Sequence, residues 1–133
     1  MRRFRVYCEN RSLYVEVRAY DSLKAMRRDL KKREGIGFSD AYGAFCSCDV
    51  VSFKSGKARK KPIVGTIYIL KSVGVGVLTH ECTHAALRWA ERIGLGEFAS
   101  TSGWSCHSEE RFCWVVGNLA STIGTRLGWG SQE

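Results

Sequence analysis

The sequence predicts an α+β fold in which a small sheet packs against two apolar helices. Three patterns support this: alternating apolar and polar residues over the first 20 positions, a run dense in β-branched residues at 63–70, and apolar residues at helical spacing after residue 72. The 133 residues, 44% of them hydrophobic, fit one packed domain over residues 1–133. The order of elements is typical of helices packed on one side of a sheet.

A β-hairpin and a surface helix are expected in the first third of the chain. "RFRVYCE" (3–9) and "LYVEVRAY" (13–20) alternate as half-buried strands do, and "ENRS" between them reads as a turn. A helix follows, with Asp21 or Ser22 as its cap and Gly35 at its end. Its narrow apolar stripe and basic opposite face are typical of a helix on the surface.

Further strands are expected in the middle of the chain. "AYGAFCSCDVVSF" (41–53) predicts one or two strands, and the charged segment 54–62 predicts a loop. The strand with the strongest pattern is "IVGTIYIL" (63–70), because β-branched residues pack well on a pleated surface.

Two apolar helices are expected at the C-terminal end. The first begins between Ser72 and Val77 and ends at Gly94, a typical C′ residue. After a loop of small and polar residues, a second helix is expected from Glu109 to Leu127. Gly117 and Gly124 lie within it, and we expect them to allow close packing against another helix. The tail after Leu127 is expected to fray.

The net charge and the cysteine residues limit the classes of function that the chain can have. The net charge is +8, and its basic residues cluster at 2–5, 27–34 and 54–61. Such clusters attract nucleic acid or acidic surfaces, although they also occur as solvated surface. No secretory signal and no apolar run of membrane-spanning length are visible, so we expect a cytoplasmic protein with no membrane partner. Its six cysteines are then expected to be reduced and mostly buried.

The segment "LTHECTHAALRW" (78–89) holds the clearest chemical motif. On a helix, His80 and His84 lie one turn apart on the same face, so both imidazoles can reach one Zn²⁺ ion. Glu81 is offset around the helix, where it can act as general base on a water molecule activated by the metal. The alternative is a pair of surface histidines on an amphipathic helix, and the apolar flanks of the motif argue against it.

A catalytic zinc ion normally has three protein ligands, so a third is needed. Glu109 and Glu110 begin the next expected helix, and His107 lies in the loop before it. We favour Glu110, with Glu109 or His107 as alternatives; Cys106 would be unusual for this chemistry. A histidine six residues after His84, as in metzincins, is excluded because that position is alanine.

With these residues in place, "IVGTIYIL…GVLTHECTHAALRW…SEERFCWVVGNL" resembles the small gluzincin-type zinc metallopeptidases of phages and prophages. It also looks related to the ImmA/IrrE-type and SprT-like groups. The resemblance covers residues 63–119 and implies a minimal zincin-like fold. It further implies His80, His84 and Glu110 as ligands, Glu81 as base, and a strand before the active-site helix that runs along the substrate cleft. His107, Tyr68 or an arginine would then stabilise the oxyanion.

The sequence therefore predicts a zinc metallopeptidase that acts on a protein or peptide. A SprT-like protease acting on DNA-associated proteins is one alternative, since the basic clusters allow nucleic-acid contacts. A non-enzymatic, zinc-stabilised binding or inhibitor protein is another, although a structural zinc site has no need of Glu81. Strand 63–70 has two expected roles, as an edge strand that pairs with an extended peptide or as core packing. Substrate, cleavage specificity and oligomeric state do not follow from the sequence.

Overall fold

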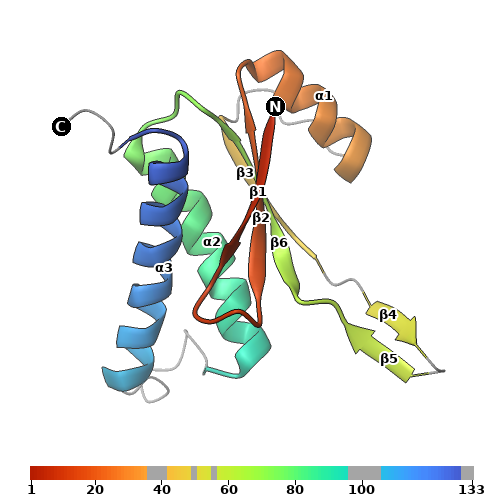
Figure 1. Cartoon of the computed structure of the whole chain (residues 1–133), viewed down its shortest axis with the longest axis vertical. Coiled ribbons are helices and arrows are strands. Elements are labelled where there is room, and N and C mark those ends of the chain that lie inside the picture. Colours follow the sequence, from red (N-terminus) through yellow and green to blue (C-terminus); the bar gives the residue numbers. More distant parts are fainter. Residues whose placement is uncertain (36–41, 49–50, 55–56, 96–105, 130–133) are drawn as a thin grey trace.

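The computed structural model describes residues 1–35, 42–48, 51–54, 57–95 and 106–129. Within these ranges the helices and strands are, in chain order, β1 (Arg2–Tyr7), β2 (Tyr14–Tyr20), α1 (Leu23–Glu34), β3 (Gly43–Ser47), β4 (Val51–Lys54), β5 (Lys57–Lys60), β6 (Ile63–Leu70), α2 (Val75–Ile93) and α3 (Cys106–Arg126). The predicted α+β class is confirmed (Figure 1).

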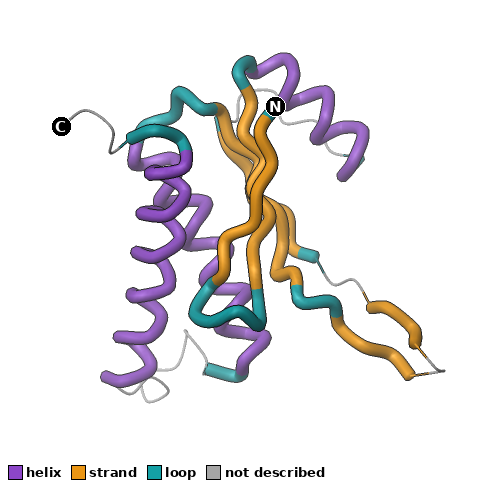
Figure 2. Tube along the Cα trace, in the orientation of Figure 1, coloured by secondary structure: helices purple, strands orange, loops and turns teal. Residues whose placement is uncertain are grey.

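A four-stranded mixed sheet organises the fold, in the order β1-β2-β6-β3. The hairpin strands β1 and β2 are antiparallel, β2 and β6 are parallel, and β6 and β3 are antiparallel. Strands β4 and β5 form a separate two-stranded hairpin that projects away from α2 and α3 (Figure 2). One or two strands were expected within 41–53, and the structure has two, β3 and β4, whereas the loop expected over 54–62 contains β5.

The helices cover both faces of the sheet. Helices α2 and α3 lie side by side on one face, and α1 lies on the other (Figure 1). The expectation that the helices share one side therefore holds for α2 and α3 and is wrong for α1. Two side chains of α1, Met26 and Leu30, are buried against this opposite face, and the helix is otherwise largely charged.

The core lies between the sheet and the two C-terminal helices. Val15 and Val17 of β2 and Ile67 and Ile69 of β6 alternate toward this side, and all four are fully buried. The largest buried side chain, Trp89, comes from α2. This apolar contact fixes the position of α2, the helix that carries the histidine motif.

The ends of the first two helices follow the sequence signals. The Ser22 side chain accepts a hydrogen bond from the backbone N–H of Ala25, which caps α1. Gly35 and Gly94 follow α1 and α2 with positive φ angles, which a residue without Cβ adopts at no cost. Helix α3, however, begins three residues earlier than expected, at Cys106, so that His107 lies in its first turn rather than in a loop.

The two glycines of α3 do not mediate contact between helices, contrary to the prediction. Gly117 is exposed, and a Cβ atom added there would meet nothing within 4 Å. A Cβ atom at Gly124 would lie 3.0 Å from the Trp129 ring, so this glycine makes room for the turn after α3. The described part of the tail thus folds back onto the helix instead of fraying.

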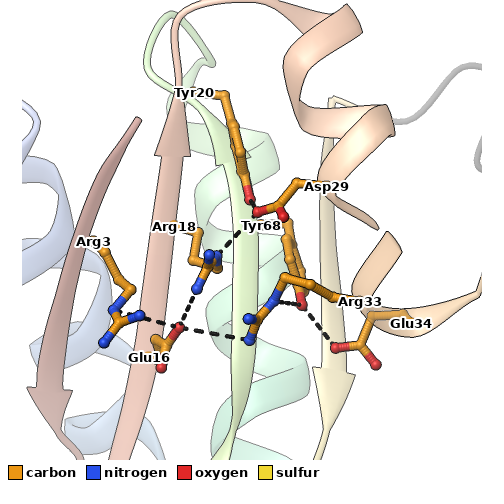
Figure 3. A network of polar contacts seen from close by, with 8 residues as sticks. All are labelled: Arg3, Glu16, Arg18, Tyr20, Asp29, Arg33, Glu34 and Tyr68. Atoms are coloured by element: carbon orange, nitrogen blue, oxygen red, sulfur yellow. Dashed lines mark hydrogen bonds and ion pairs between the residues drawn. The ribbon is translucent and has the colours of Figure 1, made fainter. Parts of the chain in front are cut away.

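A polar network joins α1 to its face of the sheet (Figure 3). Arg18 donates hydrogen bonds to Glu16 at 2.9 Å and to Asp29 at 3.1 Å, and the Tyr20 hydroxyl also donates to Asp29. Burial by itself raises the pKa of the Asp29 carboxyl. The hydrogen bond from Tyr20 and the charge of Arg18 outweigh burial, so the pKa lies below its ordinary value of 3.8.

Replacing Asp29 by Asn is expected to reduce the free energy of unfolding by about 1–2 kcal/mol at neutral pH. Because folding lowers this pKa, the ionised carboxylate contributes stability above about pH 4, and the contribution is lost as pH falls through the folded-state pKa. Urea unfolding from pH 7 to pH 3 should therefore show a difference between Asp29→Asn and wild type that shrinks with acid.

Asp21→Asn is the matched control for this measurement. Asp21 pairs with Lys71 at 3.1 Å, but its side chain is 76% exposed. Such a surface pair contributes less than about 0.5 kcal/mol. Equal losses in the two variants, or a loss for Asp29→Asn that does not depend on pH, would contradict the assignment.

Among the described helices, none is both long and apolar enough to cross a lipid bilayer.

Candidate metal and catalytic site

The residues of the histidine motif lie on two sides of helix α2, one exposed and one buried. Its buried residues, including Leu78, Ala85 and Trp89, face the sheet and α3. His80 and His84 lie one turn apart on the exposed side, and the His80 side chain is 66% exposed. The helical periodicity thus places both imidazoles at the surface of a helix whose other side is fixed in the core.

The two histidine side chains converge. Their Nε2 atoms are 3.2 Å apart and the ring centroids 4.8 Å apart, with the rings nearly perpendicular. Two nitrogens bound about 2.0–2.1 Å from one tetrahedral zinc ion lie roughly 3.3–3.4 Å apart. The observed distance fits a shared zinc ion. It also fits a hydrogen bond between the rings, which binding of the metal would replace.

Glu81 lies at the boundary between the exposed and buried sides of α2. It is 6% exposed, and its Oε1 atom is 3.9 Å from Nε2 of His80. Burial raises the pKa of the Glu81 carboxyl, and the charges of His80 and His84 counteract this only in part. A buried carboxyl group of raised pKa beside two imidazoles is well suited to take up and release a proton.

Strand β3 passes directly over this carboxyl group. A Cβ atom at Gly43 would lie 3.2 Å from Cγ of Glu81 and 3.0 Å from Cγ1 of Val77. Glycine therefore suits this position, because any larger residue would press on both of these side chains. Strand β3 is also an edge of the four-stranded sheet, so the histidine motif lies beside a sheet edge.

The described surface beside the histidines is hollowed. The hollow has a volume of about 460 Å³ and is lined by Val75, Gly76, Thr79, His80, Thr83, His84 and Leu87. Apart from the two imidazoles, this lining is apolar or carries only hydroxyl groups. It can therefore accept an uncharged chain segment next to the two candidate ligands.

The three predicted candidates for the third ligand lie at the start of α3. His107, Glu109 and Glu110 are exposed residues within the first five positions of α3. This part of α3 lies next to the C-terminal half of α2, since the Arg111 guanidinium stacks on the Trp89 ring at 5.6 Å. Within the described ranges, no three His, Cys, Asp or Glu side chains are grouped closely enough to hold a metal ion.

Two roles expected near the site are wrong. Tyr68 cannot face Glu81, because its hydroxyl donates to Glu34 at 2.7 Å and accepts from Arg33 at 3.1 Å on the α1 side of the sheet. Strand β6 is not an edge strand, since it lies between β2 and β3. Its role is core packing, and β3 takes the position expected for it beside the motif.

The described cysteines do not extend the site. Cys8 and Cys82 are buried, and burial raises the pKa of each thiol to about 12. Thiols with such a pKa are protonated at neutral pH and react slowly. The expectation of free, buried cysteines is confirmed for these two, whereas Cys113 is exposed.

Sequence reasoning missed Gly43 as a residue of the site. Its importance comes from the packing of β3 over α2, and a glycine near the start of a strand carries no sign of that contact. Comparison with known proteins found no matching family model, curated protein or solved structure.

Proposed function

We propose that this chain is a cytoplasmic zinc metallopeptidase of the gluzincin type, of phage or prophage origin, that hydrolyses peptide bonds in a protein or peptide. The observation that carries the proposal is the 3.2 Å approach of Nε2 of His80 to Nε2 of His84 beside the buried carboxyl group of Glu81. Two imidazoles supply zinc ligands, and the adjacent carboxylate supplies the base that peptide hydrolysis requires.

In this proposal each residue has one role. His80 and His84 hold the zinc ion, which when bound lowers the pKa of water and polarises a carbonyl group. Glu81 accepts a proton from the attacking water molecule on a carboxylate oxygen and later donates it to the leaving nitrogen. Because burial already raises its pKa, Glu81 takes up that proton more readily than an exposed glutamate would.

The proposed substrate is an extended segment that lies along the outer edge of β3, where no other described strand pairs. The backbone groups on that edge can pair with a peptide strand, as in other complexes formed by strand addition. Since Gly43 lies against Glu81, a peptide paired at the start of β3 would pass close to the general base. The neighbouring hollow, lined by residues such as Val75 and Leu87, would then receive one of its side chains.

Glu110 is the proposed third ligand, with Glu109 or His107 as alternatives. All three are exposed and have no role in the core, so their side chains are available for binding. Zinc affinity measured for single alanine variants at the three positions identifies the ligand. The variant of the true ligand binds zinc least tightly, while the other two bind like wild type.

Zinc binding should depend on His84. His84→Ala is expected to lower zinc affinity more than about a hundredfold, because loss of a mere supporting partner of a ligand already costs about 10–100-fold. The measurement is a competition titration with a chromophoric chelator, together with cleavage of a denatured protein substrate before and after metal removal. Cleavage should vanish with a chelator and return with zinc.

Arg88→Ala is the control for this titration. Arg88 lies one turn further along α2, and within the described part of the chain its ion-pair partner is Glu91, an exposed residue, at 2.9 Å. This variant should bind zinc as wild type does. Equal affinity in His84→Ala and wild type would reject the metal site, and zinc binding without any cleavage would reject the peptidase.

Two other functions remain as alternatives. A SprT-like protease acting on DNA-associated proteins is favoured by the net charge of +8. A non-enzymatic protein with a zinc-stabilised fold is less favoured, because a buried carboxylate beside the ligands costs stability and has no structural use there. Cleavage that requires DNA would support the first, and zinc-dependent folding without cleavage would support the second.

A further inference from the structure

The sheet face that carries α1 also carries a row of exposed side chains on β1. Arg3, Arg5 and Tyr7 alternate along the strand and therefore point to the same side. Arg3 lies opposite Arg18, and Tyr7 lies opposite Tyr14, which places the row on the side of the polar network. This face is turned away from α2 and α3.

Two aromatic rings lie at the end of this row that is nearest the turn between β1 and β2. The Tyr7 and Tyr14 rings meet edge to face with centroids 6.0 Å apart, and the Arg5 guanidinium stacks 4.5 Å above the Tyr14 ring. Tyr7 is 39% exposed, so part of its ring is open to solvent. Tyrosine rings beside arginine planes are the side chains on which unpaired bases stack.

A basic hollow lies at the other end of the row, next to α1. It measures about 280 Å³ and is lined by Met1, Tyr20, Ala25, Arg28, Asp29 and Lys32. Arg28 and Lys32 lie one turn apart on α1 and both point into it. The carboxylate of Asp29 already accepts hydrogen bonds from Arg18 and Tyr20, so the hollow as a whole favours an anion.

The charge on this face is unbalanced because its acidic groups are already engaged. Glu16 pairs with Arg18, and the Glu34 carboxylate accepts from the Tyr68 hydroxyl. In contrast, no ion pair involves Arg5, Arg28 or Lys32 within the described part of the chain. The surplus positive charge is thus available to an anionic partner.

We propose that this surface, formed by Arg3, Arg5, Tyr7, Tyr14, Arg28 and Lys32, binds single-stranded nucleic acid. The basic residues contact phosphates, and Tyr7 stacks with an unpaired base; a duplex offers no such base. This "β1–α1 surface" lies across the sheet from the histidine motif. The inference therefore holds whether or not the chain is a peptidase.

The experiment measures fluorescence anisotropy of a labelled oligo(dT) of about 15 nucleotides, a length that covers one such surface. Binding should be detected at about 50 mM salt and weaken steeply as salt increases. Arg5→Ala/Arg28→Ala/Lys32→Ala should lose at least tenfold in affinity and reduce the salt slope by about 2, since each phosphate contact contributes roughly 0.7. Tyr7→Ala should lose roughly tenfold with an unchanged slope.

Arg88→Ala, which removes one exposed charge from α2, is the control and should bind within about twofold of wild type, because salt largely screens an exposed charge that lies across the sheet from the proposed surface. Glu81→Gln should also bind oligo(dT) like wild type, which separates this test from that of the peptidase. Absence of oligo(dT) binding at low salt would overturn the proposal. So would equal losses of affinity in the triple variant and in Arg88→Ala. A third contrary result would be a hairpin duplex that binds as tightly as oligo(dT), with no effect of Tyr7→Ala. Circular dichroism establishes that each variant is folded.

Discussion

Replacing Glu81 by Gln is expected to lower the rate of peptide cleavage by about 10²–10⁴-fold while leaving zinc affinity nearly unchanged. The amide has the shape of the carboxyl group but cannot accept the proton of the attacking water. The two imidazoles that hold zinc in our proposal are untouched. Initial rates on a denatured protein substrate and zinc content by mass spectrometry give the two readouts.

The same variant should also differ in stability. Folding raises the pKa of Glu81, so its ionised form destabilises the metal-free fold at pH values above the folded-state pKa. The neutral amide introduced by the substitution removes that cost. Metal-free Glu81→Gln should therefore have a Tm at pH 7 equal to or above that of wild type, and the difference should disappear at pH 4, where wild-type Glu81 is protonated.

Glu91→Gln provides the comparison, because Glu91 is an exposed glutamate on the same helix that pairs with Arg88. Its cleavage rate should match that of wild type. Full activity in Glu81→Gln would refute the assignment of the base. Loss of zinc together with activity would instead assign Glu81 a role as ligand, which its position around the helix does not favour.

Local signals in the sequence were sufficient for the centre of the site. The i, i+4 spacing of His80 and His84 determines that both share a helix face, and the apolar residues around them determine which side of α2 is buried. The caps at Ser22 and Gly94 act through the neighbouring backbone alone, so their positions could be predicted as well. These features need no knowledge of distant parts of the chain.

Contacts between distant segments could not be predicted in this way. The β-branched run 63–70 suits an edge strand or a central one equally, and only the pairing of β6 with both β2 and β3 decides between them. The same pairing brings Gly43 over Glu81, across 38 positions of sequence (81 − 43). The edge beside the site therefore belongs to β3, a strand with a weaker sequence pattern.

The third ligand shows the same limitation. Glu109 and Glu110 were singled out because they begin an apolar helix, but a metal site depends on how α3 packs against α2. Arg111 stacks on Trp89, five residues after His84, so the N-terminal part of α3 lies along the later part of α2. Residues 96–105, which connect the two helices, lie outside the described ranges, so the ligand stays a prediction.

Gly65→Ala is expected to destabilise the fold by about 3 kcal/mol, near the upper end of the usual cost of overpacking. Gly65 lies in the central strand β6, and an added Cβ atom would lie 2.5 Å from the Cys46 carbonyl oxygen and 2.5 Å from Cζ of Phe45. The ring can rotate away, but the carbonyl group belongs to the backbone of β3. Relief therefore requires β3 to move away from β6, and Gly43 of β3 would then move relative to Glu81.

The matched control, Gly117→Ala, makes the same chemical change where there is space. Gly117 is exposed in the interior of α3 and has no atom near an added Cβ, so alanine should stabilise the helix by about 0.5–1 kcal/mol. Urea unfolding of both variants measures the contrast. If Gly65→Ala were as stable as wild type, the close contact between β3 and β6 would be wrong, and with it the placement of β3 over Glu81. If Gly65→Ala unfolds at a lower urea concentration than wild type while Gly117→Ala unfolds at a higher one, the loss of stability comes from the contact with β3 and not from replacing glycine as such.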